Sequence, residues 1–183
     1  DTEILIECAL ELELPDKASV LDLGTGTGAI ALSLASERPE WHLTASDAFA
    51  EVVELAQKNA KHNQLERVTV VRSVWFELFV GERFHLIVSN PPYIDPQDPH
   101  LKQGDLRFEP VSALVAQEKG MADINHIVKN AINHLHPEGW LMLEHGYQQG
   151  ELVRSCFESA SFNHVKTVND YGNNERITMG QIA

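Results

Sequence analysis

Residues 18–35, ASVLDLGTGTGAIALSLA, decide how this chain folds. Ala18 to Leu23 form a short apolar run that predicts a buried strand, and Ala29 to Ala35 are strong helix formers. Between them lies the loop Gly24-Thr25-Gly26-Thr27-Gly28. Because glycine has no Cβ, this backbone can curl under a ligand and present N–H groups near the positive end of the helix. The pattern predicts a strand, a ligand-binding glycine loop and a helix N-terminus.

The glycine loop by itself leaves the ligand open. Gly24-x-Gly26-x-x-Ala29 fits the permissive G-x-G-x-x-A form of the dinucleotide fingerprint as well. A tight turn between strand and helix that binds nothing is a weaker alternative, since three glycines alternate with threonines here.

An acidic residue, Asp47, follows the next expected strand, His42 to Ser46. A carboxylate at that place can accept hydrogen bonds from both hydroxyls of a ribose. The alternative is an N-cap for the helix that begins near Phe49, and both roles can hold together. Adenosylmethionine and NAD both carry such a ribose, so Asp47 does not separate them.

The run Ser89-Asn90-Pro91-Pro92-Tyr93 follows the apolar segment Phe84 to Val88, where a buried strand reaches its carboxyl end. Residues at that edge of an open α/β sheet face a ligand crevice. Two successive prolines have no N–H to donate, so the stretch displays the Asn90 side-chain amide and the Pro91 carbonyl. A flat group with an NH2 can give both hydrogens to two such oxygens while Tyr93 covers its face. The stretch therefore predicts chemistry at a planar nitrogen.

The remaining pattern predicts further alternation of helices and strands. An amphipathic helix is expected at Ile4 to Leu12, and the last two strands, Val165 to Val168 and Arg176 to Ile182, are too close in sequence for a parallel crossover and should pair antiparallel. Other elements are expected as helices at Val52–Ala60, Ile124–Leu135 and Val153–Ala160, and strands at Val68–Val71 and Trp140–Glu144. The chain is predicted to be an α/β protein with a mostly parallel sheet.

Composition predicts one domain over residues 1–183, with 43% hydrophobic residues and no apolar run long enough to span a membrane. Cys8 and Cys156 lie far apart, and His134 and His136 would face different sides of a helix, so neither a disulfide framework nor a metal site is expected. A net charge of −13 argues against direct binding of nucleic acid. Because the first residue is Asp1 and not Met, we expect a cytoplasmic fragment of a longer protein, with no oligomeric state indicated.

Together, the glycine loop and Asn-Pro-Pro-Tyr resemble the S-adenosylmethionine-dependent amino-methyltransferases. More narrowly, the chain resembles the HemK/PrmC family, the glutamine methyltransferases of peptide chain release factors, whose members carry an additional N-terminal helical domain. The matching stretches are Asn90–Asp95, Arg107-Phe108-Glu109-Pro110, Leu143-Glu144-His145-Gly146 and Asp170–Arg176. A dinucleotide dehydrogenase would have no use for Asn-Pro-Pro-Tyr at the end of this strand.

The resemblance implies a Rossmann-like, seven-stranded class I methyltransferase fold, S-adenosyl-L-methionine as cofactor, and transfer to the N5 nitrogen of the glutamine in a Gly-Gly-Gln loop. It implies adenine contacts for Trp75, and the alternative is that Trp75 is a large hydrophobic residue that caps the edge of the sheet. Relatives often carry an acidic residue just before that aromatic one, whereas this chain has Val74, so Ser73 or a backbone carbonyl would accept from the adenine instead. The expected sites are, for the cofactor, Gly24, Thr25, Gly26, Thr27, Gly28, Asp47, Trp75 and Asn90; for catalysis, Asn90, Pro91 and Tyr93; and for the substrate, Asn90, Pro91, Pro92 and Tyr93.

Three alternatives stay open at this point. A glutamine methyltransferase of a ribosomal protein would share both motifs. A DNA or RNA amino-methyltransferase would need a basic, aromatic-lined groove. A module that binds cofactor without catalysis would show no turnover on any substrate. The long polar segment from Ile94 to Pro110 is expected to be a functional or mobile loop, with Arg107 and Glu109 ordering it.

Overall fold

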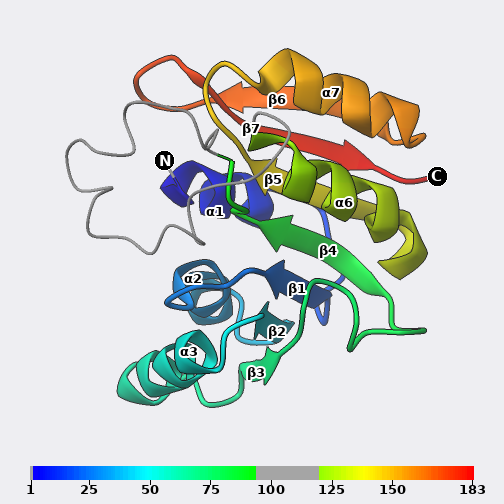
Figure 1. Ribbon diagram of the computed structural model, residues 1–183. Coiled ribbons are helices and arrows are strands. Elements are labelled where there is room, and N and C mark those ends of the chain that lie inside the picture. Colours follow the sequence, from blue (N-terminus) through cyan, green and yellow to red (C-terminus); the bar gives the residue numbers. More distant parts are fainter. Residues whose placement is uncertain (1, 94–119) are drawn as a thin grey trace.

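A computed structural model describes residues 2–93 and 120–183 of the chain. Its centre is a seven-stranded sheet in the order β3-β2-β1-β4-β5-β7-β6 (Figure 1). The first five strands in sequence run parallel, and β7 pairs antiparallel with both β5 and β6. The strands are β1 (Ser19–Leu23), β2 (His42–Asp47), β3 (Thr69–Arg72), β4 (Phe84–Ser89), β5 (Leu135–Glu144), β6 (Asn163–Asn169) and β7 (Glu175–Gln181). The predicted α/β fold and the antiparallel final pair are confirmed.

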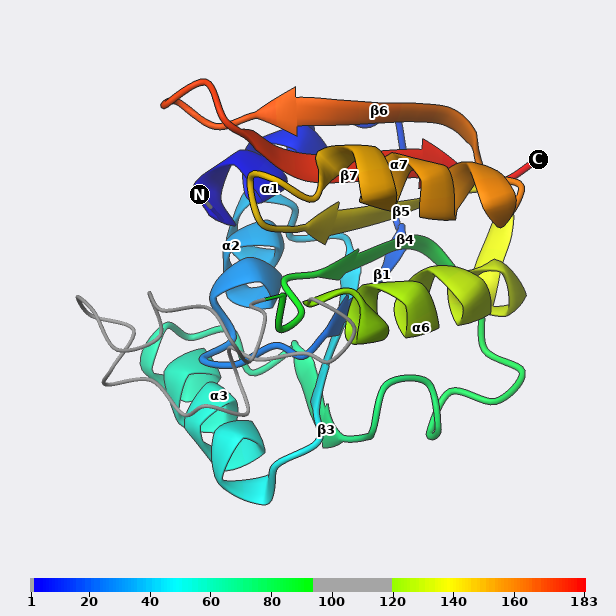
Figure 2. The ribbon, with the colours of Figure 1, turned by 45° about the horizontal axis from the view of Figure 1, so that its top comes forward.

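Helices cover both faces of the sheet (Figures 1 and 2). One layer contains α1 and α2 and the other contains α6 and α7, while α3 packs beside β2 and β3. The helices are α1 (Thr2–Leu10), α2 (Ala29–Glu37), α3 (Ala50–His62), α6 (Ala122–Ala131), the short 3-10 helix η3 (Ile132–His134) and α7 (Gly150–Ser159). No helix in the described ranges combines the length and the apolar character needed to cross a membrane.

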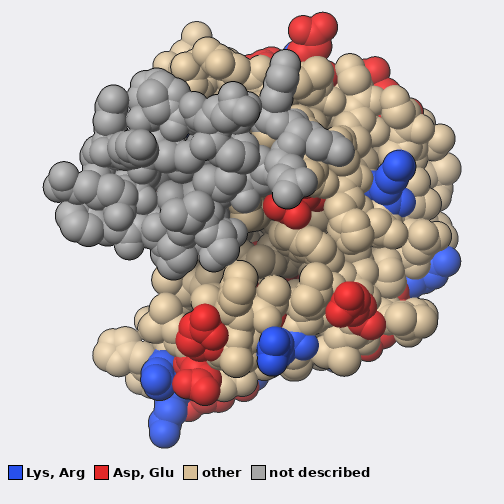
Figure 3. All heavy atoms as spheres, viewed as in Figure 1, with Lys and Arg blue, Asp and Glu red and all other residues tan. Residues whose placement is uncertain are grey.

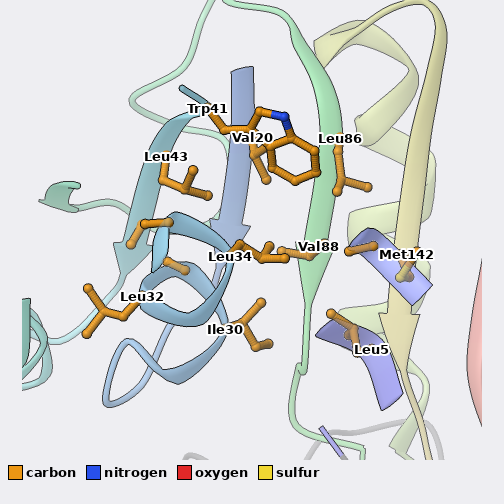
Figure 4. Close-up of a cluster of buried hydrophobic side chains, with 14 of the residues drawn as sticks. Leu5, Val20, Ile30, Leu32, Leu34, Trp41, Leu43, Leu86, Val88 and Met142 are labelled. Carbon is orange, nitrogen blue, oxygen red and sulfur yellow. The ribbon is translucent and has the colours of Figure 1, made fainter. Parts of the chain in front are cut away.

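The central strands β1, β4 and β5 carry apolar residues on both faces, because successive side chains point to opposite sides of the sheet and helices cover both sides. Val20 and Val88 pack with Leu34 of α2, as Figure 4 shows, whereas Leu21 and Ile87 point into the cluster beneath α6 and α7. Burial of each Leu, Ile or Val side chain stabilises the folded state by about 1.5–3 kcal/mol relative to leaving it exposed. These two clusters hold the central strands in fixed register.

The register brings the carboxyl ends of β1, β2, β4 and β5 to one edge of the sheet. Leu23 pairs with Ser46 on one side and with Ser89 on the other, and Ser89 pairs in turn with Leu143. The strand order reverses at β1, since β2 lies to one side of it and β4 to the other. Such a switch point is where open α/β sheets form ligand crevices.

The predicted boundary between α6 and β5 was wrong, and the first helix ends at Leu10 and not at the expected Leu12. Leu135 continues the apolar helical spacing from Ile124, but α6 ends at Ala131 and Leu135 begins β5. There it is fully buried and pairs with Phe84, after which the register shifts before Leu86 pairs with Trp140. A buried position on a strand and one on a helix both require an apolar residue, so spacing alone could not assign Leu135.

Candidate functional site

The glycine loop has the backbone shape that its sequence requires. Gly24, Gly26 and Gly28 have φ angles of 66°, 56° and 86°, in the left-handed region that other residues rarely adopt. The loop is fixed by the Thr25 amide, which donates to the Ser46 carbonyl at 2.9 Å, and by the Gly28 amide, which donates to the Thr25 carbonyl at 2.9 Å. The loop is thereby tied to the end of β2 and leads into α2.

Asp47, at the end of β2, lies against this loop. Its Oδ2 accepts the Gly26 amide at 3.1 Å, and its Oδ1 accepts the Phe49 amide at 3.2 Å. Phe49 is itself the N-cap of α3, so Asp47 supports the start of that helix from two residues before the cap. A carboxylate has about four lone-pair sites, which leaves Asp47 capacity for two ligand hydroxyls.

Trp75 follows β3 and lies over the same loop. Its ring is 3.6 Å from the position that a Cβ on Gly24 would occupy, so the absence of a side chain there makes room for the indole. Trp75 has a φ of 46°, a left-handed conformation that costs a bulky residue energy. The Ser73 hydroxyl holds this turn by donating to the Trp75 carbonyl at 3.0 Å and accepting the Leu78 amide at 3.2 Å. That hydroxyl is buried and engaged in its own turn, and the neighbouring Val74 side chain is exposed.

Asn90 and Tyr93 are both connected to Glu144, at the end of β5. The Asn90 Nδ2 donates to the Thr2 hydroxyl at 3.2 Å, and that hydroxyl donates to Glu144 Oε2 at 2.8 Å. The Tyr93 hydroxyl lies 3.5 Å from Glu144 Oε1. Glu144 is only 3% exposed, and burial raises the pKa of its carboxyl despite the hydrogen bond from Thr2 and the charge of Arg176. The sequence placed Glu144 in the stretch Leu143-Glu144-His145-Gly146 but did not predict a role for its side chain.

Gln149 holds the backbone of the same motif. Its Oε1 accepts the Gly146 amide at 2.8 Å, and its Nε2 donates to the Tyr93 carbonyl at 2.9 Å. Because Pro91 and Pro92 have no N–H, this motif must be held through its carbonyls and side chains. Gln149 was missed from the sequence, since no pattern links it to Tyr93.

Asp22 is a second missed residue and is fully buried at the end of β1. Its Oδ2 accepts the Thr25 hydroxyl at 2.6 Å and the Ala31 amide at 3.3 Å. Its Oδ1 has no hydrogen-bond partner within residues 2–93 and 120–183. Burial above all raises the pKa of Asp22 to about 7, and the nearby charge of Asp47 adds to the rise. The signal that could have found it is an acidic residue in an apolar strand directly before the glycine loop.

These residues fit a nucleoside cofactor with a cationic group. Asp22 offers a buried oxygen that no described residue hydrogen-bonds, and the glycine loop lets a ligand approach the backbone. Asp47 has lone pairs beyond those that accept the Gly26 and Phe49 amides, and Trp75 supplies a flat apolar surface. The Ser89 hydroxyl donates to the Leu23 carbonyl at 2.6 Å and so fixes the Asn90 region beside the loop. A cofactor held by the loop would therefore lie next to the Asn-Pro-Pro-Tyr stretch.

Some predicted residues cannot be placed in this way. Asp95, Arg107 and Glu109 lie outside the described residues. Within the part of the chain that the structure describes, no group of three or more His, Cys, Asp or Glu side chains is arranged to hold a metal ion.

Comparison with known proteins agrees with this geometry. Residues 1–105 match the family model "Methyltransferase small domain". Release factor glutamine methyltransferases of Pseudomonas aeruginosa and Escherichia coli are 57% and 54% identical over 100% and 99% of this chain, which spans 66% and 65% of their lengths. The crystal structure of a release factor-specific protein-(glutamine-N5) methyltransferase from Alicyclobacillus acidocaldarius has a TM-score of 0.61 and 25% identity, covering 99% of this chain and 91% of that one.

The resemblance inferred from the two motifs is confirmed by these identities, which extend over nearly the whole chain. The glycine loop, Asp47, Trp75 and Asn90 all fall within the residues that the family model matches. The chain thus belongs to the methyltransferase small domain family.

Proposed function

We propose that this protein transfers a methyl group from S-adenosylmethionine to the side-chain N5 nitrogen of the glutamine in the Gly-Gly-Gln motif of peptide chain release factors, in the cytoplasm. The names of the relatives and of the similar crystal structure support this substrate. The observation that carries the proposal is the placement of the Asn90 amide: its nitrogen is held by Thr2, beside the buried Pro91 and the glycine loop.

The cofactor supplies an electrophilic methyl group on a positively charged sulfur. Asp47 would accept from its ribose hydroxyls, Trp75 would cover its adenine, and the buried Oδ1 of Asp22 would face its cationic end. The glycine loop Gly24–Gly28 would pass beneath it, with no Cβ in the way at Gly26. These contacts would place the methyl group at the carboxyl end of β4.

Asn90 and Pro91 act on the substrate amide. An amide nitrogen is a poor nucleophile because its lone pair is delocalised into the carbonyl, as in a peptide bond. When Asn90 Oδ1 and the Pro91 carbonyl accept its two hydrogens, the lone pair is directed at the methyl group and the positive charge growing on nitrogen is stabilised. As the nitrogen–carbon bond forms, the carbon–sulfur bond would break and release S-adenosylhomocysteine as a neutral thioether, and one of the two amide hydrogens would then leave as a proton to solvent. Tyr93 and Pro92 cover the plane of the amide. Holding the two reactants in this geometry can supply roughly 7–11 kcal/mol at the limit, without a dedicated strong base.

The surface is consistent with a protein substrate. On the face drawn in Figure 3, the Lys and Arg side chains of the described residues are interspersed with Asp and Glu and do not gather in a basic stripe. Proteins that bind nucleic acid neutralise phosphates with such a stripe, and this chain carries a net charge of −13. A nucleic-acid amino group is therefore the less supported substrate.

The test is transfer of labelled methyl from S-adenosylmethionine to unmodified release factor. A release factor in which the loop glutamine is replaced is the matched control, a ribosomal protein substrate is a further arm, and cofactor binding is measured in parallel by calorimetry. Label on the parent factor and none on the variant is expected. Label on the ribosomal protein alone would reassign the substrate, and cofactor binding with label on no substrate would overturn the assignment for this chain.

A further inference from the structure

The hydrogen-bond chain from Glu144 through Thr2 to Asn90 has a direction. An ionised carboxylate can only accept hydrogen bonds. The single hydrogen of the Thr2 hydroxyl is therefore donated to Glu144 Oε2, 2.8 Å away. Toward Asn90, 3.2 Å away on its other side, the Thr2 oxygen can then only accept. The amide nitrogen of Asn90 satisfies that requirement and the amide oxygen does not.

The two ends of an asparagine side chain have nearly the same shape, so packing alone does not decide which end faces which way. Hydrogen-bond partners decide it. With its nitrogen turned to Thr2, Asn90 presents Oδ1 on the opposite side as an acceptor. A flipped amide would present its NH2 to the NH2 of a substrate, and two donors would meet.

We propose that Glu144, acting through Thr2, is a positioning device that fixes the Asn90 amide with its oxygen toward the substrate nitrogen. This inference rests on the proposed function and adds positioning residues to it. Thr2 lies in α1, Asn90 directly follows β4 and Glu144 ends β5, so the device links three parts of the chain distant in sequence. Neither Glu144 nor Thr2 needs to touch the substrate.

The burial of Glu144 makes this arrangement effective. At 3% exposure, its carboxylate has few water molecules to compete with the Thr2 hydroxyl. Its other oxygen faces the Tyr93 hydroxyl at 3.5 Å. One buried acceptor thus orients two side chains of the same motif.

Three variants test the device through kinetics. Thr2→Val keeps the shape of the side chain and removes its hydroxyl, whereas Thr2→Ser keeps the hydroxyl. Thr69→Val makes the same change on an exposed threonine of β3. We expect kcat for methyl transfer to fall about fivefold in Thr2→Val, the effect of one ordinary hydrogen bond. The Kd for cofactor should stay within about twofold in all three variants, and kcat should stay near the parent value in Thr2→Ser and Thr69→Val. Equal kcat in Thr2→Val and the parent would overturn the device.

A structural measurement on the unaltered chain separates this inference from the proposed function. In a ¹⁵N-labelled sample, the NH2 hydrogens of Asn90 are expected to show nuclear Overhauser effects to the Thr2 side chain. Their absence would mean that the amide is turned the other way and would overturn the inference, whether or not methyl transfer is observed. If these contacts are present and no label reaches any release factor, the device stands and the proposed substrate falls.

Discussion

Gln149 donates a hydrogen bond from Nε2 to the carbonyl of Tyr93 at 2.9 Å and so ties the loop after β5 to the motif after β4. The same side chain accepts the Gly146 amide through Oε1 at 2.8 Å, which assigns both ends of the amide. A Cβ on Gly146 would be 3.0 Å from that Oε1, so glycine permits the close approach. The motif that would receive the substrate is thus anchored by a residue 56 positions further along the chain.

Replacing Gln149 should slow catalysis and leave cofactor binding nearly unchanged. Gln149→Met keeps the length of the side chain and removes the hydrogen bonds to the Tyr93 carbonyl and the Gly146 amide, so we expect turnover to fall about tenfold as Tyr93 loses this anchor. Gln148→Met, at the exposed neighbouring position, is the control. Steady-state kinetics with release factor and calorimetry with cofactor would measure both effects. Turnover at the level of the control would show that Tyr93 is held in place by other contacts.

Asn90→Ala should lose about 10²–10³ in turnover, the usual effect of removing one preorganised polar group at a reacting centre. Cofactor affinity should change much less, because the glycine loop, Asp47 and Trp75 remain. Asn133→Ala, at an exposed position on η3, controls for the substitution itself. Single-turnover methyl transfer gives the comparison, and a rate near that of the control would rule out the proposed role of Asn90.

Asp47→Ala should show the opposite pattern. Loss of a charged acceptor for ribose hydroxyls, together with its bond to the Gly26 amide, should weaken cofactor binding about 10- to 100-fold. Asp16→Ala removes a carboxylate from an exposed turn before β1 and should have no effect. Calorimetric titration with S-adenosylmethionine measures the affinity. An unchanged Kd in Asp47→Ala would remove this residue from the site.

Asp22 should make the stability of the unliganded protein fall as pH rises. Its pKa is about 7 in the folded chain and 3.8 as the ordinary value, so between these values the folded state binds more protons than the unfolded state. The free energy of unfolding must then decrease from about pH 4 to about pH 7, by several kcal/mol at about 1.4 kcal/mol per pKa unit. Asp22→Asn keeps an acceptor for Thr25 and removes the titration. Urea unfolding of both proteins across this range should show the difference shrinking toward low pH; parallel curves would contradict the buried carboxylate.

The same group predicts a pH dependence for the cofactor. A cationic group placed against Oδ1 favours ionised Asp22, so binding below about pH 7 must release a proton. Affinity should fall as pH decreases through this range, and the measured enthalpy should vary with the ionisation enthalpy of the buffer. Asp22→Asn should bind more weakly and without this proton release. Proton release in the variant equal to that of the parent would assign it to another group.

Gly28→Ala and Gly26→Ala form a matched pair. Both positions have positive φ, which costs a residue with a Cβ about 1–2 kcal/mol. At Gly26 the added Cβ meets nothing within 4 Å, whereas at Gly28 it would lie 3.1 Å from Leu32 Cδ1 and 3.5 Å from the Ala56 Cβ. We expect Gly28→Ala to lose about 1 kcal/mol more than Gly26→Ala in urea unfolding. Equal losses would mean that α2 and α3 move apart at little cost.

The fold was predictable because its signals are local. Alternation of apolar runs, the glycine loop and the short gap before Arg176 predicted the elements, the mostly parallel sheet and the antiparallel final pair. The seven-stranded class I methyltransferase sheet was expected through family resemblance, and the order of its strands was not predicted. Leu135 was assigned to a helix because burial imposes the same residue type on both structures, and only its pairing with Phe84 decides between them.

Those residues of the candidate site were predictable whose type is required either by the backbone conformation or by a position at the end of a strand. Gly24, Asp47 and Asn90 are of this kind. Glu144, Thr2 and Gln149 were not predictable as partners of the motif, because each hydrogen bond joins residues more than fifty positions apart and depends on side-chain geometry. The place of Asp22 in an apolar strand before the glycine loop is visible in the sequence, but its burial and the hydrogen bonding of its two oxygens are visible only in the structure.

The place of β7 between β5 and β6 has a consequence for synthesis of the chain. In the described residues, β6 joins the sheet only through β7, although it precedes β7 in sequence. A nascent chain therefore exposes unpaired backbone on both β5 and β6 until residues 175–181 have left the ribosome. Unpaired strand edges of this kind recruit other chains. A premature stop before β7 would thus leave unpaired strand edges on both β5 and β6 of the truncated chain, and we expect such a chain to need a chaperone or to be degraded.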